Sequence, residues 1–186
     1  MNRHGRRGFQ AETGRCRDYL YAAGVRAGEN VGLLARNSPG FVCAYMAIAS
    51  LGAVVVPINY QLTAQEVAYV VKDAGMRNMV VGKELDLAGP LAGFGCPAPA
   101  QHLLEKIAVF AGPAAPPTDE AIDENQTCAI IYTSGTTGNP KGAMLSHLNL
   151  VSDAECYAKA MPVFARDNIL CILPLYHCLA WTCIIL

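Results

Sequence analysis

Three short apolar runs separated by two segments with helical signals are the feature that most constrains the fold of this chain. The runs are Val31–Ala35, Val54–Val56 and Met79–Val81. Each consists of aliphatic and small residues without a charge, which is typical of strands buried on both faces. Strands that alternate with helices at this spacing predict an α/β fold with a mostly parallel sheet flanked by helices.

The two intervening segments begin with helix-capping residues. Ser38 precedes Pro39, and this pair suits the N-cap and the first helical position. Thr63 and Glu66 have the spacing of a capping box, in which each side chain bonds a free backbone N–H group at the helix start. Each helical pattern ends at a glycine, as helices often do. These signals support the predicted order of strands and helices.

The two ends of this pattern differ in composition. Residues 82–117 are rich in Pro and Gly and predict a surface connection, with one helix around His102–Phe110. A further strand is expected at Thr127–Tyr132.

Residues 1–23 predict a basic leader, solvated or disordered, because no apolar stretch of a secretory signal follows its arginines. A transit peptide or a phosphate-binding arm is the alternative. The arginines are Arg3, Arg6, Arg7, Arg15 and Arg17.

Composition excludes several classes of protein. The formal net charge of -1 and the lack of a clustered basic face predict no nucleic-acid partner. The eight cysteines form no C-x-x-C pair or zinc spacing, so we expect reduced core residues in a cytoplasmic protein. Residues 169–186 lack charged side chains and reach the minimum length of a membrane helix. Pro174 and His177 interrupt this run, which favours a buried strand, a turn and a helix start over a stable membrane span.

A glycine- and hydroxyl-rich stretch, Tyr132–Gly142, follows the strand expected at 127–132. Its glycines let the backbone approach a ligand closely, so that successive N–H groups can point at phosphate oxygens. Its hydroxyls add donors or magnesium ligands, and Lys141 adds a positive charge. The stretch is not a Walker A motif, because Gly142 follows the lysine. A polar connection without chemical function is the alternative. The candidate ATP-phosphate-binding residues are Thr133, Ser134, Gly135, Thr136, Thr137, Gly138 and Lys141.

The same stretch resembles the phosphate-loop signature of the adenylate-forming (AMP-binding) superfamily, which includes acyl-CoA ligases, luciferases and peptide-synthetase adenylation domains. Leu173–His177 and Ser146–Asn149 resemble two further family segments. Asn59–Leu62 is closer to acyl-CoA ligases than to peptide-synthetase domains. The resemblance therefore implies that residues 24–186 form an incomplete N-terminal AMP-binding domain, a fragment of a longer ligase.

The resemblance also implies an activity for that longer parent. A fatty or related carboxylic acid would react with ATP to give an acyl-adenylate, and coenzyme A would then displace AMP. Mg²⁺ would accompany the ATP, with Thr133 as a ligand. His177 would lie near the carboxylate and the α-phosphate, Cys178 near the nucleotide and Trp181 along the acyl path. The fragment alone is expected to be inactive, because the family's catalytic lysine lies outside the chain; a homodimer of the full-length parent is a further expectation.

Several alternatives stay open at this stage. The chain could belong to an amino-acid or aryl-acid adenylating domain, or be a non-catalytic truncated remnant. His177 and Trp181 could be core residues. His147 is interpreted as a helix-start residue that bonds the backbone, and His4 and His102 carry no functional signal.

Overall fold

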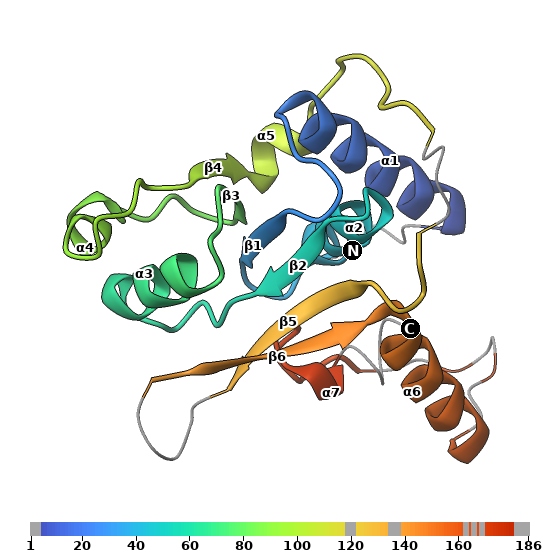
Figure 1. The fold of residues 1–186 in the computed structure, drawn as a ribbon. Coiled ribbons are helices and arrows are strands. Elements are labelled where there is room, and N and C mark those ends of the chain that lie inside the picture. The colour runs from blue at the N-terminus through green and yellow to red at the C-terminus, as the bar shows by residue number, and fades with distance from the viewer. Residues whose placement is uncertain are drawn as a thin grey trace.

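The computed structural model of this chain describes residues 5–117, 122–133, 139–161, 164, 167 and 170–180. Within these residues a six-stranded sheet has the order β4-β3-β1-β2-β5-β6. The first five strands in the chain run parallel, and β6 is antiparallel to β5. The strands are β1 (Asn30–Leu34), β2 (Val54–Pro57), β3 (Asn78–Val81), β4 (Ala100–Leu103), β5 (Thr127–Thr133) and β6 (Lys141–Ser146). The predicted α/β fold with a mostly parallel sheet is confirmed (Figure 1).

Helices cover both faces of the parallel part of the sheet. The helices are α1 (Arg6–Ala22), α2 (Pro39–Ser50), α3 (Ala64–Asp73), α4 (Ala88–Ala92), α5 (Leu104–Ala108), α6 (His147–Ala160) and α7 (Cys178–Ala180). Side chains alternate along a strand, so Val55 of β2 belongs to the core under α1 and α2, whereas Val56 belongs to the core under α3 and α4. The sheet is thus buried on two sides, as its uncharged strands predict.

The two expected helix starts have the predicted geometry. Ser38 Oγ accepts a hydrogen bond of 3.1 Å from the N–H of Phe41 at the start of α2. At the start of α3 the hydroxyl of Thr63 accepts from the N–H of Glu66, and the Glu66 carboxylate accepts from the N–H of Thr63. Both helices therefore begin where the sequence predicts, because their first N–H groups find local partners.

The N-terminal segment differs from the sequence prediction. The expectation of a solvated or disordered leader was wrong for residues 6–22, which form α1 and bury Cys16 and Leu20 against α2. Two of its arginines also bind backbone carbonyls of the later connection: Arg15 donates to Ala108, and Arg17 donates to Pro116 at 2.6 Å. This segment is thus an amphipathic helix: its arginines lie on the outer side, and its apolar face packs on α2 as part of the domain core.

The Pro- and Gly-rich connection contains more regular structure than predicted. Residues 100–103 form the edge strand β4, which pairs in parallel with β3, so the expected helix around His102 starts only at Leu104. His102 carries no signal in the sequence, yet it is buried. Its Nε2 lies 3.0 Å from Asn78 Oδ1, and its Nδ1 lies 3.4 Å from the Tyr19 hydroxyl. Tertiary pairing with β3 therefore decides the conformation of a segment with weak local preference.

The cysteines agree with only part of the prediction. In the apolar C-terminal run the expected buried strand was wrong, because the described residues 170–177 form no strand and Leu170 and Ile172 are exposed. Cys16, Cys43 and Cys128 are buried free thiols, whereas Cys156 and Cys178 are exposed. Burial raises the pKa of Cys16 to about 12 and that of Cys128 to about 11, so these two remain neutral thiols. Of the helices formed by the described residues, none is long and apolar enough to cross a bilayer.

Candidate functional site

The hairpin of β5 and β6 carries the glycine- and hydroxyl-rich stretch. Thr133 pairs with Lys141, and Tyr132 pairs with Gly142, in the antiparallel ladder. Side chains of directly opposed residues lie on the same face of such a ladder, so the Thr133 hydroxyl and the Lys141 ammonium share one face. Both residues are exposed. Five predicted phosphate-binding residues lie outside the described residues: Ser134, Gly135, Thr136, Thr137 and Gly138.

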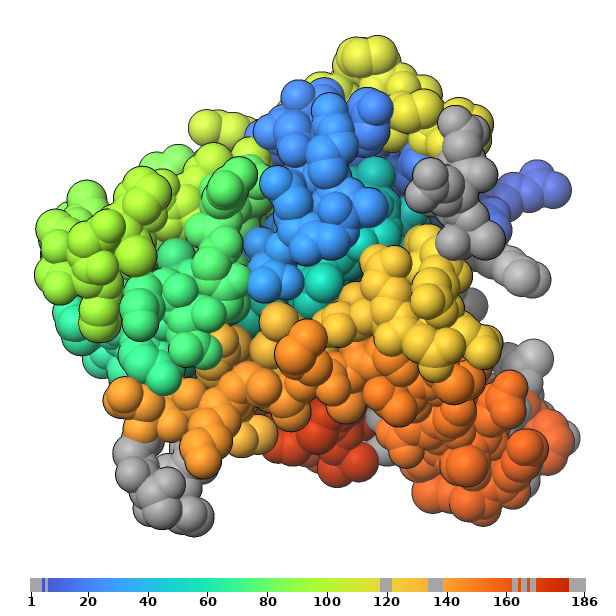
Figure 2. Space-filling view, viewed as in Figure 1, coloured from blue at the N-terminus to red at the C-terminus, as the bar shows by residue number. Residues whose placement is uncertain are grey.

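Helix α3 holds the base of this hairpin. The Tyr132 hydroxyl donates a 2.6 Å hydrogen bond to Asp73 Oδ2, and the Tyr69 hydroxyl lies 3.4 Å from the carbonyl oxygen of Pro140. Burial and the adjacent Asp73 carboxylate raise the pKa of Tyr132, so its phenol stays protonated and remains a donor. Figure 2 shows β6 running along the underside of the region formed by α3. Both strands that lead into the loop are therefore attached to one helix.

Gly142 allows β6 to lie close to β5. A Cβ atom at this position would lie 2.7 Å from Ile130 Cγ2 and 3.1 Å from the Tyr132 ring. Both are side chains of the strand that faces Gly142. The glycine that follows the motif lysine thus has a steric role in the hairpin, whereas the sequence suggested only a close approach of backbone to a ligand.

The hairpin extends from the carboxyl edge of the parallel sheet. Val55 of β2 pairs with Ala129 of β5. From this pair β2 continues only to Pro57, whereas β5 continues to Thr133. The loop base therefore projects beyond the end of β2, on the side where parallel α/β sheets bind their ligands.

The second predicted family segment lies at the same edge. The Asn37 amide, which follows β1, donates to the Leu173 carbonyl and accepts from the Leu175 N–H, each at 2.8 Å. The ring of Tyr176 contacts that of Tyr60, which follows β2, with centroids 6.0 Å apart. The ends of β1 and β2 therefore position residues 171–177, which are distant from both strands in the sequence.

His177 and Cys178 belong to this segment. The His177 N–H donates to the Pro174 carbonyl at 3.0 Å, and the Cys178 thiol lies 3.9 Å from His177 Nδ1. Both residues are exposed. Trp181 lies outside the described residues. The acyl-site and nucleotide-site roles of these residues stay predictions.

His147 has the helix-start position expected of it, directly after the N-cap Ser146. Ser146 and Asn149 form a capping box, and the His147 N–H donates to the Gln126 carbonyl at 3.2 Å. This backbone hydrogen bond agrees with the expected role, and the buried Nε2 of its side chain has no hydrogen-bond partner among the described residues. Burial lowers the pKa of His147.

Sequence reasoning missed the residues that hold the two functional segments in place. These are Asp73 and Tyr69 for the hairpin, and Asn37 and Tyr60 for residues 171–177. Each lies at the end of a predicted strand or on a predicted helix, but nothing in its local sequence names a partner. Only the strand order brings these pairs together.

The fold and the hairpin define the class of protein: an N-terminal α/β domain of the adenylate-forming type. The chain belongs to the AMP-binding enzyme family, whose sequence model matches residues 5–186. This match includes residues 6–22, for which the sequence alone gave no resemblance. The superfamily expected from residues 132–142 is thereby confirmed.

Individual relatives are CoA ligases or synthases of different acids. The chain is 34% identical to long-chain-fatty-acid–CoA ligase FadD13 of Mycobacterium tuberculosis over 95% of this chain and 36% of the relative. It is 33% identical to a feruloyl-CoA synthase of Amycolatopsis sp. over 87% of this chain and 32% of the relative. The solved structure of ATP-bound MatB from Rhodopseudomonas palustris matches with a TM-score of 0.82 and 28% identity, over 96% of this chain and 37% of that chain. The chain thus spans about a third of the length of these relatives.

Proposed function

We propose that this chain carries the ATP-phosphate loop of a carboxylate–CoA ligase that forms an acyl-adenylate from a fatty or related acid. The observation that carries this proposal is the β5–β6 hairpin at the carboxyl edge, with Thr133 and Lys141 paired at the base of a glycine- and hydroxyl-rich loop. The similarity to CoA ligases and to ATP-bound MatB supports the reaction type.

The chemistry of adenylation explains why such a loop is needed. A carboxylate attacks the α-phosphorus of ATP, and the α–β phosphoanhydride bond breaks to release pyrophosphate. This step brings two anions together and forms a highly charged leaving group, so fixed donors around the β- and γ-phosphates stabilise the transition state. Lys141 would supply a full positive charge there, and Thr133 a hydroxyl on the same face of the hairpin.

The hairpin base makes these donors preorganised. Lys141 belongs to a strand whose partner strand is attached to α3 through Tyr132 and Asp73. A cation on a fixed strand loses less freedom when the phosphates bind than one on a loose loop. We infer that Tyr132 acts as a positioning residue for the loop.

Mg²⁺ fits such a site chiefly through the nucleotide. In proteins this ion keeps several waters and binds phosphate oxygens together with few protein oxygens. Thr133, an exposed hydroxyl at the loop entrance, is the residue we assign to it. The ion would neutralise charge on the β- and γ-phosphates. The cytoplasmic location and a homodimer of a longer parent stay predictions of the sequence.

The carboxylic acid that the longer protein activates has two candidate chemical classes, fatty acids and aryl acids. FadD13 and the feruloyl-CoA synthase have nearly equal identity to this chain, 34% and 33%. An aryl-acid ligase is therefore the second candidate. Pyrophosphate exchange into ATP by a longer protein that contains this chain distinguishes the two: exchange supported by fatty acids and not by cinnamic acids or amino acids supports our proposal.

The loop is tested by Lys141→Ala in the same longer protein. We expect adenylation to fall by about 100-fold or more, as when one transition-state donor is removed. Thioester formation from supplied acyl-adenylate should fall much less, because that step needs no triphosphate. Lys72→Ala, which removes an exposed cation from α3, is the matched control and should leave both steps unchanged.

Equal losses of the two half-reactions in Lys141→Ala would contradict the phosphate role of Lys141. For the 186-residue chain alone we expect no turnover and at most weak ATP binding. Acyl-CoA synthesis by this chain would contradict that expectation.

A further inference from the structure

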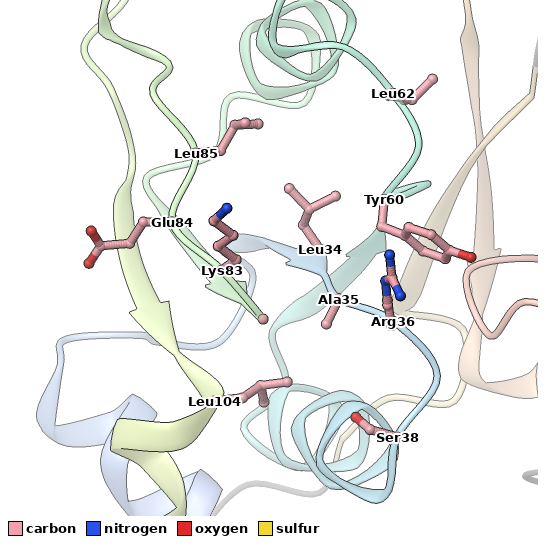
Figure 3. Close-up of a pocket in the computed structure, with 11 residues that line it drawn as sticks. Leu34, Ala35, Arg36, Ser38, Tyr60, Leu62, Lys83, Glu84, Leu85 and Leu104 are labelled. Carbon is pink, nitrogen blue, oxygen red and sulfur yellow. The ribbon is translucent and has the colours of Figure 1, made fainter.

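A second candidate site lies at the carboxyl edge of the sheet, apart from the hairpin. A cavity of about 430 Å³ opens where β1, β2 and β3 end, and Figure 3 shows its lining side chains. Its volume lies within the range of small-molecule sites, roughly 300–1,000 Å³. Its lining includes Leu34, Arg36, Tyr60, Lys83, Leu85 and Leu104.

The strand order explains why a cavity forms there. The helix that follows β1 is α2, which covers one face of the sheet, whereas α3 follows β2 on the other face. Connections that leave neighbouring strands towards opposite faces open a crevice at their carboxyl ends. The cavity therefore occupies a topological switch point, lined by residues 34–36, 38, 60, 62, 82–85 and 104.

The lining combines an apolar surface with positive charge. Leu34, Leu85 and Leu104 supply aliphatic wall, and Figure 3 shows the Leu34 side chain between Lys83 and Arg36. The Arg36 guanidinium lies 5.6 Å from the centroid of the Tyr60 ring, which holds it over an aromatic face at the rim. The cavity thus presents cations on both sides of a hydrocarbon surface.

The one acidic residue of the lining does not cancel this charge. In Figure 3 the Glu84 carboxylate points away from Leu34, whereas the Lys83 side chain lies beside Leu34. With Arg36 and Lys83 against Glu84, the lining keeps an excess of positive charge. A cationic ligand would be repelled, and a bare inorganic anion would leave the leucine surface in contact with water.

We propose that this cavity binds a small amphipathic organic anion, attracted by the positive charge of Arg36 and Lys83, with its hydrocarbon part against Leu34, Leu85 and Leu104. Carboxylates form charge-assisted hydrogen bonds with guanidinium and ammonium groups, which orient the ligand. Burial of the hydrocarbon part supplies affinity. This site shares no residue with the phosphate loop, although Tyr60 of its lining also contacts Tyr176. The proposal rests on the cavity and its charges and not on the proposed function.

The test is an NMR titration of the ¹⁵N-labelled 186-residue chain with hexanoate. We expect saturable shifts at residues 34–38, 60–62 and 82–85. Hexan-1-ol lacks the charge, and inorganic phosphate lacks the hydrocarbon. Each should bind more weakly than hexanoate by about tenfold or more. Hexylammonium should cause no shifts at these residues.

Variants assign the charge preference to side chains. Arg36→Gln and Lys83→Gln should each weaken hexanoate binding by about tenfold, as expected for one hydrogen bond to a charged group. Lys72→Gln, on α3 and outside the cavity, should bind as the parent does. Glu84→Gln should bind at least as tightly, because it removes a negative charge.

Binding of hexylammonium with equal affinity, or unchanged binding by both Arg36→Gln and Lys83→Gln, would overturn the proposal. Equal affinity for inorganic phosphate would also overturn it, because the apolar surface would then contribute nothing. Both substitutions concern exposed side chains, and the dispersion of the same spectra verifies the fold. Lys141→Ala should bind hexanoate normally, so failure of one proposal is distinguishable from failure of the other.

Discussion

The hydroxyl of Tyr132 lies 2.6 Å from Asp73 Oδ2 and joins two residues that are 59 positions apart in the sequence. Tyr132 belongs to β5, one residue before the loop, and Asp73 is the last residue of α3. Because α3 is packed on the sheet through Val67 and Val71, this hydrogen bond connects the loop base to the core of the domain.

Tyr132→Phe should therefore weaken both stability and loop function. The substitution removes one hydrogen bond to a carboxylate that is itself exposed, so we expect the free energy of unfolding to fall by about 1 kcal/mol. Urea unfolding of the chain measures this loss. In a longer active protein the same variant should raise the KM for ATP, because the loop is then less well positioned.

A double-mutant cycle with Asp73→Ala separates this contact from other effects of each change. The two substitutions together should cost less than the sum of their separate costs. Strict additivity would show that the hydrogen bond contributes nothing to stability. Tyr60→Phe is the matched control, since its ring contacts persist without the hydroxyl.

Gly142→Ala should destabilise the hairpin for steric reasons. The new Cβ would meet Ile130 Cγ2 at 2.7 Å, so either β6 moves away from β5 or the Ile130 side chain shifts. We expect a loss of about 1–3 kcal/mol, as for overpacked sites. Thermal or urea unfolding measures it.

Gly14→Ala is the contrasting control. Gly14 lies within α1, and a Cβ there would meet nothing within 4 Å. Alanine should stabilise the helix by about 0.5–1 kcal/mol because it restricts the unfolded chain. If both substitutions changed stability equally, the close approach of Gly142 to β5 would not be the cause.

The capping box of α3 should make stability depend on pH. The backbone N–H and the hydroxyl of Thr63 bond the Glu66 carboxylate and lower its pKa from the ordinary value of 4.5. A depressed pKa in the folded state gives stability that is complete above 4.5 and is lost as the pH falls through the folded value.

Glu66→Gln should lower the stability of the chain at neutral pH and reduce its decline in acid. Urea unfolding across the acidic range measures the difference. The capping box of α6, formed by Ser146 and Asn149, contains no titratable group, so Asn149→Ala should lower stability by the same amount at every pH. An identical acid profile in Glu66→Gln and the parent would contradict the assigned role.

His102 should contribute a second pH dependence, at higher pH. Burial lowers its pKa from the ordinary value of 6.5. A neutral imidazole satisfies both neighbours, with Nε2–H donating to Asn78 Oδ1 and Nδ1 accepting from the Tyr19 hydroxyl. As the pH drops, His102 is protonated at a higher pH in the unfolded chain than in the folded chain. Stability should therefore fall as the pH drops from 6.5 towards the lower pKa of the folded state.

His102→Gln should flatten the stability profile as the pH falls below 6.5, because the group whose pKa burial lowers is then absent. The half-buried His147 is present in both proteins, so its contribution cancels in the comparison. An unchanged profile in His102→Gln would show that its protonation is not linked to folding.

Local patterns predicted most of the parallel sheet. Uncharged runs gave β1, β2, β3 and β5, and the Ser38 and Thr63 caps marked the starts of α2 and α3. These features depend on neighbours a few residues away, which is why one sequence suffices. The edge strand β4 was missed because its four residues show neither an apolar run nor an alternating pattern, and its pairing with β3 is a tertiary contact.

The residues of the candidate site also fall into two groups, those predicted from local sequence and those that depend on tertiary contacts. The motif glycines, hydroxyls and lysine were readable in the sequence because the chemistry of phosphate binding demands those residue types in one short stretch. Their anchors, such as Asp73 for the hairpin and Asn37 for residues 171–177, were not readable, because their partners lie far away in the chain.

The sequence by itself determined the fold class and the family resemblance and predicted a phosphate loop, since each follows from residue types and spacing within short segments. The tertiary structure alone decided that residues 6–22 belong to the core, that Gly142 is sterically required and that a cationic cavity forms between β1, β2 and β3. These outcomes follow from strand order, which determines which distant side chains share a surface.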